Sequence, residues 1–409
     1  MGSAISIGQT GLAASSKQME VIGNNLANAN TIGFKSSSTL FANMMNQGLS
    51  SAGSLAAGQG VEVTDMPTQF TQGSFENTGN VTDMAIDGEG FFIVKDPTGI
   101  PLYTRAGAFH IDNGDNLVDG KGYKMQGYSI ENGVLSTVPA DLVLLKSKDA
   151  IATTEVSFGA KLDEGTATAG AFVVSQNVYD SKGGSHTLSI TFTKTATAGL
   201  WNLSATFDGI ASSVASSAAS IQFETDGTFI PAADVTLTIA VADPEVAAKL
   251  KGATIGTANV VNWAVFTKPS EKLTGYTSTS IVRSLSSDGY ALGNLRTLNI
   301  DSNGYISGVY TNGEVVSMAR VCLANFRDQT ALKKNGNYFA ETTASGSALP
   351  NPAGSGGLGE IQSNSLEVSN TDVSREFINM ITAQRAYQAS AKVITTADQM
   401  LTELMNIKR

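Results

Sequence analysis

The segment 369–409 constrains the fold more than any other part of the sequence, because it holds neither proline nor glycine and carries a regular apolar repeat. Apolar residues recur every seven positions, and others lie three or four positions after them: Val373, Met380, Tyr387, Ile394 and Leu401, then Phe377, Ala391, Met405, Ala383, Ala397 and Leu404. This spacing predicts one apolar stripe along a long helix, with Asn370, Thr371 and Asp372 as capping residues. A strict heptad favours a left-handed supercoil with a partner helix.

The start of the chain has a matching stripe. Apolar residues recur at heptad spacing, and two more lie three positions later: Ile5, Leu12, Met19 and Leu26, then Ile22 and Ala29. We expect a first helix over 3–28, which would pair with the C-terminal helix as a hairpin. Because two helices alone bury little apolar surface, self-association is expected. The alternative is that the C-terminal helix is a core helix of a globular domain, and Gln384 and Asp398 do interrupt its stripe.

Composition excludes several classes of function. The chain has 409 residues and a formal charge of −10, which argues against a general nucleic-acid binder. No apolar run is long enough to span a membrane, so no membrane insertion is expected. The first residues lack the basic and apolar regions of a Sec signal peptide, so no such signal is expected. A single cysteine, Cys322, excludes an intramolecular disulfide.

The segment 24–35, NNLANANTIGFK, follows the first predicted helix. Asparagine side chains compete with helical hydrogen bonds, and glycine accepts a positive φ angle. The segment is therefore predicted to end the helix and turn the chain outward. The residues of interest in this segment are Asn24, Asn25, Asn28, Asn30, Thr31, Gly33, Phe34 and Lys35.

The middle of the chain predicts antiparallel β-structure. Short alternating runs over 61–128 and 287–326 are separated by turn dipeptides such as Asp119-Gly120 and Asn303-Gly304. The region 147–280 is looser and holds further strand–turn units, with a short helix expected within 241–250. A second short helix is expected at 36–46, followed by a small-residue linker at 48–60.

No catalytic, cofactor or metal site is predicted. His186 lies six residues after Asp180, but alternation places it on a strand, and sequence proximity is not triad geometry. The Asp-rich segments 112–116 and 301–304 lack the spacing and final glutamate of a calcium loop, so turn chemistry explains them. Cys322 is expected to be a buried, small apolar residue. We therefore predict a non-enzymatic protein without a cofactor.

Several segments resemble the axial rod and hook proteins of the bacterial flagellum. Asn24–Lys35 is similar to their N-terminal signature, and Ser369–Leu401 to their C-terminal signature. The run Asp83–Tyr128 resembles the inner β-domain of rod and hook proteins, and Val178–Lys194 resembles a strand pair of the outer domain of hook proteins. The insert at 147–280 favours the hook within this family, because rod proteins are shorter.

The resemblance implies an α+β multidomain fold. Paired, coiled-coil-like terminal helices (1–60 plus 361–409) would carry an inner β domain (61–146 plus 281–360), with an outer β domain (147–280) inserted in it, both mainly antiparallel. The expected function is a self-polymerising subunit of the hook, the flexible joint that transmits motor torque from rod to filament. Its helix seam would comprise Ile5, Leu12, Met19, Ile22, Leu26, Val373, Phe377, Met380, Tyr387, Ala391, Ile394, Leu401 and Met405.

Implied partners are further copies of the chain, rod proteins, hook–filament junction and hook cap proteins, and the flagellar export apparatus. The expected location is the hook of the flagellum, outside the cell. Three alternatives stay open. A distal rod or hook-associated protein would share the terminal signatures. A secreted β-rich adhesin would fit only the middle of the chain. A cell-wall hydrolase would need an acid pair or metal site in the insert.

Overall fold

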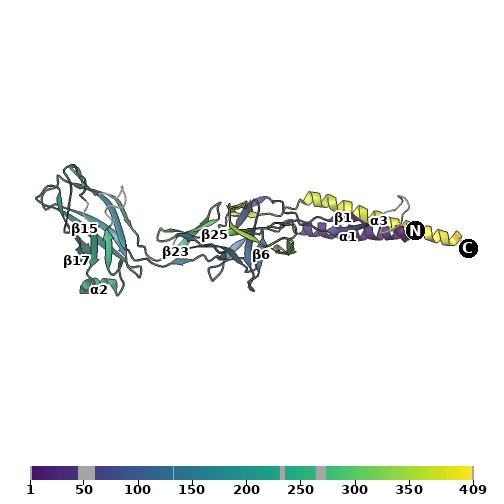
Figure 1. Cartoon of the computed structure of the whole chain (residues 1–409), viewed down its shortest axis with the longest axis horizontal. Coiled ribbons are helices and arrows are strands. Elements are labelled where there is room, and N and C mark those ends of the chain that lie inside the picture. Colours follow the sequence, from purple (N-terminus) through teal and green to yellow (C-terminus); the bar gives the residue numbers. More distant parts are fainter. Residues whose placement is uncertain (1, 45–59, 132, 231–234, 264–272, 408–409) are drawn as a thin grey trace. The chain divides into compact units, whose positions relative to one another are not determined.

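The computed structural model describes residues 2–44, 60–131, 133–230, 235–263 and 273–407 (Figure 1). These residues form two compact units. The first comprises 1–145, 298–308 and 316–409, and the second comprises 146–297 and 309–315. The helices α1 (Gly2–Ala27) and α3 (Val373–Ile407) belong to the first unit, as the terminal stripes predict. The observed α+β architecture, with packed terminal helices and β-rich units, confirms the expected fold class.

The helix predicted at 36–46 is wrong. Strand β1 (Leu40–Asn43) instead pairs antiparallel with β2 (Val61–Asp65), and residues 45–46 lie outside the described ranges. The preceding backbone is held extended by side chains, since the Ser36 N–H donates to Asn370 Oδ1 and the Ser37 N–H donates to Asn25 Oδ1. Most of the predicted linker 48–60 also lies outside the described residues.

The body of the first unit is a sheet of short antiparallel strands. Its central part has the order β25–β9–β5–β6–β27–β26. Strand β5 (Phe91–Lys95) is buried on both faces: Phe92 and Val94 join one apolar core, and Phe91 and Ile93 join another. This explains the uninterrupted apolar run FFIV. The predicted Asp119-Gly120 turn follows β8 (Leu117–Asp119) and leads into β9 (Lys124–Glu131).

The first unit also contains the other strands of this sheet and short strands beside it. They are β3 (Phe75–Asn77), β4 (Met84–Asp87), β6 (Pro101–Thr104), β7 (Phe109–Ile111), β10 (Val134–Leu135), β11 (Ala140–Asp141), β25 (Val315–Asn325), β26 (Lys333–Asn335), β27 (Tyr338–Ala340), β28 (Leu349–Pro352), β29 (Glu360–Ser363) and β30 (Ser365–Glu367). Strand β30 pairs with β3, and β29 pairs with β4, so the segment that leads into α3 is joined to the β body twice.

The second unit is a mostly antiparallel sheet around a core of aromatic residues. Trp201, Trp263, Phe158 and Phe192 are fully buried, and the rings of Phe158 and Trp263 are stacked with centroids 4.5 Å apart. The elements are β12 (Ser147–Lys148), β13 (Glu155–Asp163), β14 (Ala171–Tyr179), β15 (Ser185–Lys194), β16 (Leu200–Phe207), β17 (Ile210–Ser216), β18 (Ser220–Gln222), β19 (Val235–Ile239), α2 (Pro244–Leu250), β20 (Val260–Trp263), β21 (Thr274–Tyr276) and β22 (Ile281–Ser287). Strands β23 (Gly293–Ile300) and β24 (Tyr305–Tyr310) have residues in both units.

The short helix expected within 241–250 is α2. It begins after Asp243, whose side chain accepts a hydrogen bond from the Glu245 N–H, and Pro244 occupies the first helical position. Both features are typical helix-start signals. Strand β22 pairs antiparallel with β13 within the second unit.

Candidate self-assembly surface

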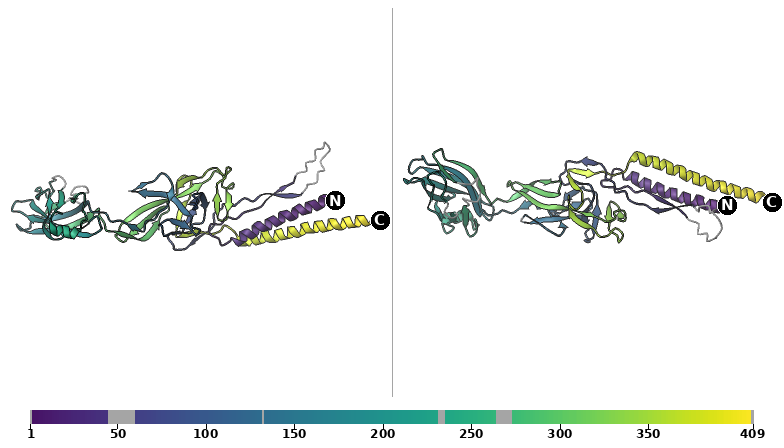
Figure 2. Two further views of the ribbon diagram at one scale, coloured as in Figure 1. Left: turned by 90° about the horizontal axis from the view of Figure 1, so that it is seen from below. Right: turned by 45° about the horizontal axis from the view of Figure 1, so that its top comes forward.

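The terminal helices α1 and α3 lie side by side and run in opposite directions (Figure 2). Near the end of α1, Asn25 Nδ2 donates a hydrogen bond to Glu376 Oε1 at 3.3 Å, close to the start of α3. At the other end of the pair, Gly8 of α1 faces Ile394 of α3. The two chain ends therefore form an antiparallel helical hairpin.

Small side chains bring the two helices close together. A Cβ atom added at Gly8 would lie 2.7 Å from Ile394 Cγ1, and one added at Gly11 would lie 2.7 Å from Ser390 Oγ. On α3, Ala383 and Ala397 are each 1% exposed. Because small residues line this contact, the hairpin buries little apolar area and leaves larger side chains outside it.

The predicted seam residues divide into two groups. In the first group, Ile22 is buried, and these residues are half-buried: Ile5, Leu12, Met19, Leu26, Met380, Ala391, Ile394 and Leu401. The second group is exposed: Val373, Phe377, Tyr387 and Met405. The hairpin thus covers only part of the stripe that the sequence indicates.

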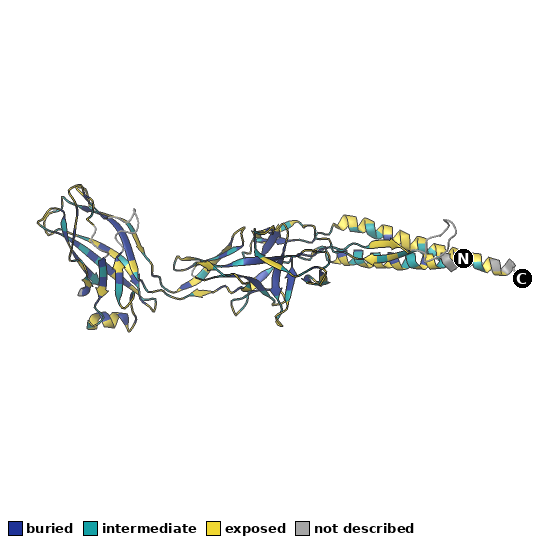
Figure 3. Ribbon diagram, viewed as in Figure 1, coloured by how far each residue is buried: buried dark blue, intermediate teal, exposed yellow. Residues whose placement is uncertain are grey.

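Additional large apolar side chains of α3 are exposed, as the yellow parts of this helix in Figure 3 show. Ile378 is 65% exposed and Ile381 is 51% exposed, and Val393 and Met400 are about half exposed. Ile381 lies about 160° around the helix from Ala383, on the side away from α1. The sequence analysis missed these residues. A signal existed for two of them, because Ala386, Val393 and Met400 form a second heptad series.

The predicted N-terminal signature forms the turn between α1 and the β body. Asn25 is 1% exposed, and its side chain bonds both backbone groups of Ser37. Gly33 has a φ of 65°, and a Cβ atom there would lie 2.3 Å from the Ala106 nitrogen, so only glycine fits. Phe34 is buried. Asn24, Asn28 and Thr31 bond one another locally, whereas Asn30 is exposed.

Lys35, the last signature residue, is part of a buried ion cluster. Its Nζ donates to Glu367 Oε1 at 2.6 Å and to the Thr71 carbonyl at 2.8 Å. Glu367 Oε2 also accepts from Arg105 Nη1 at 3.4 Å. The Lys35 and Glu367 side chains are fully buried, and Arg105 is 3% exposed. Burial lowers the pKa of Lys35, and the neighbouring Glu367 carboxylate opposes that shift. The cluster joins residues from both chain ends and the β sheet.

The side chains considered for catalysis or metal binding are hydrogen-bonded to their own chain or buried in the fold. His186 lies on β15, with Nδ1 2.8 Å from Asp208 Oδ2 and Nε2 3.3 Å from Asp180 Oδ2. Asp112 Oδ1 accepts from the Gly114 and Asn116 N–H groups, as a turn residue does. Cys322 is buried, and burial raises the pKa of its thiol to about 11. Among the described residues, no group of three ligating side chains suits a metal, and no helix is long and apolar enough to cross a membrane.

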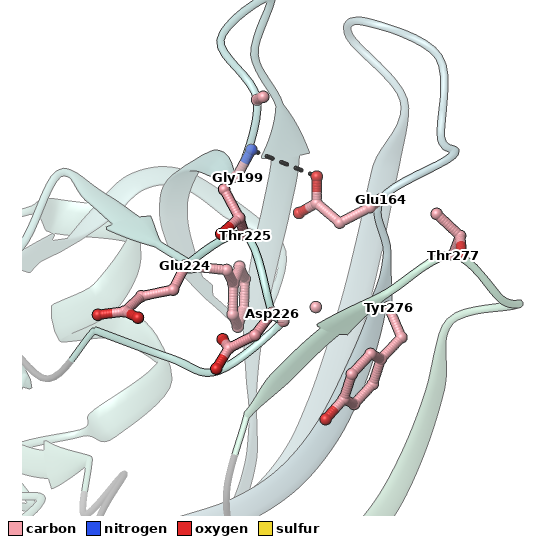
Figure 4. Close-up of a pocket in the computed structure, with 11 residues that line it drawn as sticks. Glu164, Gly199, Glu224, Thr225, Asp226, Tyr276 and Thr277 are labelled. Carbon is pink, nitrogen blue, oxygen red and sulfur yellow. Dashed lines mark hydrogen bonds between the residues drawn. The ribbon is translucent and has the colours of Figure 1, made fainter.

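The second unit has an open pocket of about 390 Å³ near Glu164, Glu224, Asp226 and Tyr276 (Figure 4). Glu164 is held by its own chain, because it accepts hydrogen bonds from Lys194 Nζ, Trp201 Nε1 and the Gly199 N–H. Burial by itself would raise the pKa of Glu164, but these bonds outweigh it and hold the pKa below the usual value. The Glu164 carboxylate therefore stabilises the fold of the second unit.

Four models of known families match parts of the chain. Residues 5–35 match the model described as flagella basal body rod protein, and residues 362–407 match the flagellar basal body rod FlgEFG protein C-terminal model. Residues 85–160 match the flagellar hook protein FlgE/F/G D1 domain, and residues 145–290 match the flagellar basal body protein FlaE D2 domain.

Curated relatives match over almost the whole chain. A flagellar hook protein FlgE of Borreliella burgdorferi is 33% identical over 445 aligned residues, and those of Escherichia coli and Salmonella typhimurium are 32% and 33% identical. Each alignment covers 98% of this chain and 98% of the relative. The chain belongs to the flagellar hook protein family. It is a hook subunit, which confirms the expected function over the rod, adhesin and hydrolase alternatives.

A solved structure agrees with the fold. The crystal structure of Helicobacter pylori flagellar hook protein FlgE2 superposes with a TM-score of 0.51 at 13% sequence identity, and covers 72% of this chain and 100% of that chain. At this identity the likeness supports the fold alone.

Proposed function

We propose that neighbouring copies of this hook subunit associate through the exposed apolar side chains of α3, and that this association drives polymerisation. The observation that supports the proposal is that the intramolecular partner α1 packs on the Ala383 and Ala397 face, while Phe377, Ile378 and Ile381 remain exposed. Exposed apolar groups of this size mark interaction surfaces. A second copy is their natural occupant in a polymer-forming family.

The seam residues fit this proposal in two roles. The half-buried members, such as Leu12 and Ile394, stabilise the hairpin. The exposed members, such as Phe377 and Met405, would contact neighbouring copies. Head-to-tail contacts that do not close into a ring generate a helical polymer. Ordering of the two helices would then be completed by assembly, because a helical pair with a small-residue contact is marginal alone.

The substitution Ile381→Glu tests the proposal. Ile381 is half exposed in the monomer, so its replacement should leave monomer melting unchanged. In the polymer it would bury a charge, which we expect to raise the critical concentration for assembly at least tenfold. Thr382→Glu is the matched control, since it adds the same charge at an exposed position about 100° around the helix. Electron microscopy and sedimentation measure assembly. Equal critical concentrations for the two variants would remove Ile381 from the interface.

We further infer three domains: terminal helices (1–60 plus 361–409), an inner β domain (61–146 plus 281–360) and an inserted outer domain (147–280). Removal of 1–35 and 370–409 should then leave a non-polymerising chain with β-type circular dichroism. Loss of all β signal would mean that the termini belong to one global core. The separate apolar cores of the two compact units support the division between inner and outer parts.

The remaining functional statements rest on family membership. The hook would transmit torque without enzymatic activity. Its ends would contact rod, junction and cap proteins, and the subunit would leave the cell through the flagellar export apparatus. Mass spectrometry of the N-terminus in isolated hooks tests the export route. An N-terminus that begins well inside α1 would indicate a cleaved signal and would contradict this route.

A further inference from the structure

A polar pocket of about 450 Å³ lies in the first unit, between the end of α1 and the β26–β27 hairpin. The side chains that line it are Asn24, Asn28, Thr31, Phe34, Lys334 and Asn337. The two walls are bonded to each other, because Asn337 Nδ2 donates to the Ile32 carbonyl at 2.9 Å. The pocket is therefore built from two segments about 300 residues apart in sequence, which hold it open.

Lys334 provides the charge of this pocket. Its Nζ donates to the Lys35 carbonyl at 2.7 Å and lies 4.1 Å from the centroid of the Phe34 ring. Burial lowers the pKa of Lys334. An ammonium group has three N–H donors, and among the described residues no carboxylate forms an ion pair with this one. A half-buried cation without a counter-ion is costly unless an anion joins it.

The neighbouring buried cluster offers Lys334 no counter-ion. Its carboxylate, Glu367, already pairs with both Lys35 and Arg105. The chain as a whole is acidic, because its 36 acidic residues outnumber its 26 basic residues. Other copies of the chain therefore present many carboxylates to an ammonium group that has no ion-pair partner among the described residues.

We propose that this pocket binds an aspartate or glutamate side chain of a second copy of the chain, with Lys334 as the charged partner and the Asn24 and Asn28 amides at its rim. The proposal rests on the proposed function, because it assigns an ion pair between copies to the polymer. The pocket adjoins the end of α1, beside the helices through which copies associate. Pairing would compensate a charge that the monomer leaves unbalanced, so assembly gains an electrostatic contribution that salt weakens.

Crosslinking identifies the contact directly. Chains labelled with ¹⁴N and ¹⁵N are mixed as monomers, polymerised and treated with a carbodiimide, which couples an amine to a carboxylate that touches it. Mass spectrometry should find Lys334 joined to an acidic peptide in mixed-isotope pairs. If mixed-isotope links form elsewhere in the polymer while Lys334 remains uncoupled, the proposal is wrong. If wild-type chains do not polymerise at all, the proposed function itself fails.

A substitution series measures the contribution. Lys334→Met keeps an apolar stem over Phe34 and removes the charge, and we expect about a tenfold higher critical concentration at low salt with a weaker salt dependence. Lys333→Met is the matched control, because Lys333 is the adjacent, exposed lysine of β26. Lys334→Arg should restore assembly to within about threefold of wild type. Melting of each monomer checks its fold. Equal assembly of the Lys334→Met and Lys333→Met variants would overturn the proposal.

Discussion

Replacement of Glu367 by glutamine tests the role of the buried ion cluster. The carboxylate accepts from Lys35 Nζ, Arg105 Nη1 and the Gly73 N–H, and it is fully buried. The Glu367→Gln variant leaves two buried cations without a counter-charge, which costs about 3–5 kcal/mol. Lys35→Met should cost less, because Arg105 and Glu367 still form a pair of zero net charge. The first unit should therefore melt lowest in the Glu367→Gln variant.

The chain provides a separate probe for each unit. Cys322 is buried in the first unit, and both tryptophans, Trp201 and Trp263, lie in the second. A loss of 3–5 kcal/mol should speed labelling of the Cys322 thiol by about a hundredfold to a few thousandfold when opening is fast and reversible. The tryptophan fluorescence transition should not move.

Glu360→Gln serves as the control for this experiment, since Glu360 is an exposed carboxylate on the nearby strand β29. Labelling of the Glu367→Gln variant at the control's rate would refute the reasoning. So would a Lys35→Met variant that opens more readily than Glu367→Gln, because the net charge of the cluster would then not decide its energy.

Three further predictions follow from close packing and from shifted pKa values. Gly11→Leu should push the helices apart and destabilise the hairpin by about 1–3 kcal/mol in circular dichroism melts, whereas Gly23→Ala, with no atom near the added Cβ, should stabilise α1. The pKa of the Cys322 thiol is raised in the folded state, so denaturant midpoints of the wild type should fall as pH rises from about 9 to 11, and Cys322→Ala should remove this loss. The pKa of Glu164 is lowered, so its contribution is present above the normal glutamate pKa and lost as pH falls below it; Glu164→Gln should flatten this acid-side decrease in tryptophan-monitored melts. An unchanged pH dependence in either variant would contradict its assignment.

The elements with a strong local pattern could be predicted from the sequence. The heptad stripes predicted α1 and α3 within a few residues, and the Asx-Gly dipeptides predicted hairpin turns such as the one after Asp119. The helix at 36–46 was wrong because Leu40, Phe41 and Met44 fit a helical spacing over one turn. Pairing with β2, about twenty residues later, decided the conformation, and local periodicity carries no information about such a partner.

The finer features of the site depend on contacts between distant residues. Lys35 and Glu367 are 332 positions apart, so no local pattern pairs them. The hairpin face was predicted only in part. The sequence analysis placed Ala383 and Ala397 in the stripe but weighted the large apolar residues, whereas the closest approach is at Gly8 and Gly11. The small residue between these two alanines at the same heptad spacing, Ser390, was the unused signal, because it lies against Gly11.

Because small residues line the contact between α1 and α3, we infer that the register of the hairpin is set at one end. Glycine and alanine contacts bury little apolar area per helical turn, so sliding one helix along the other would cost little free energy. The polar contacts where the two helices meet the β body are specific. Asn25 bonds both Ser37 and Glu376, and Lys35 bonds Glu367. These contacts fix the helices where they leave the β body. The last turns of α3 extend past the start of α1 (Figure 1), so their alignment depends on whatever packs against them. These polar contacts therefore orient the hairpin, and the proposed association with neighbouring copies would complete it.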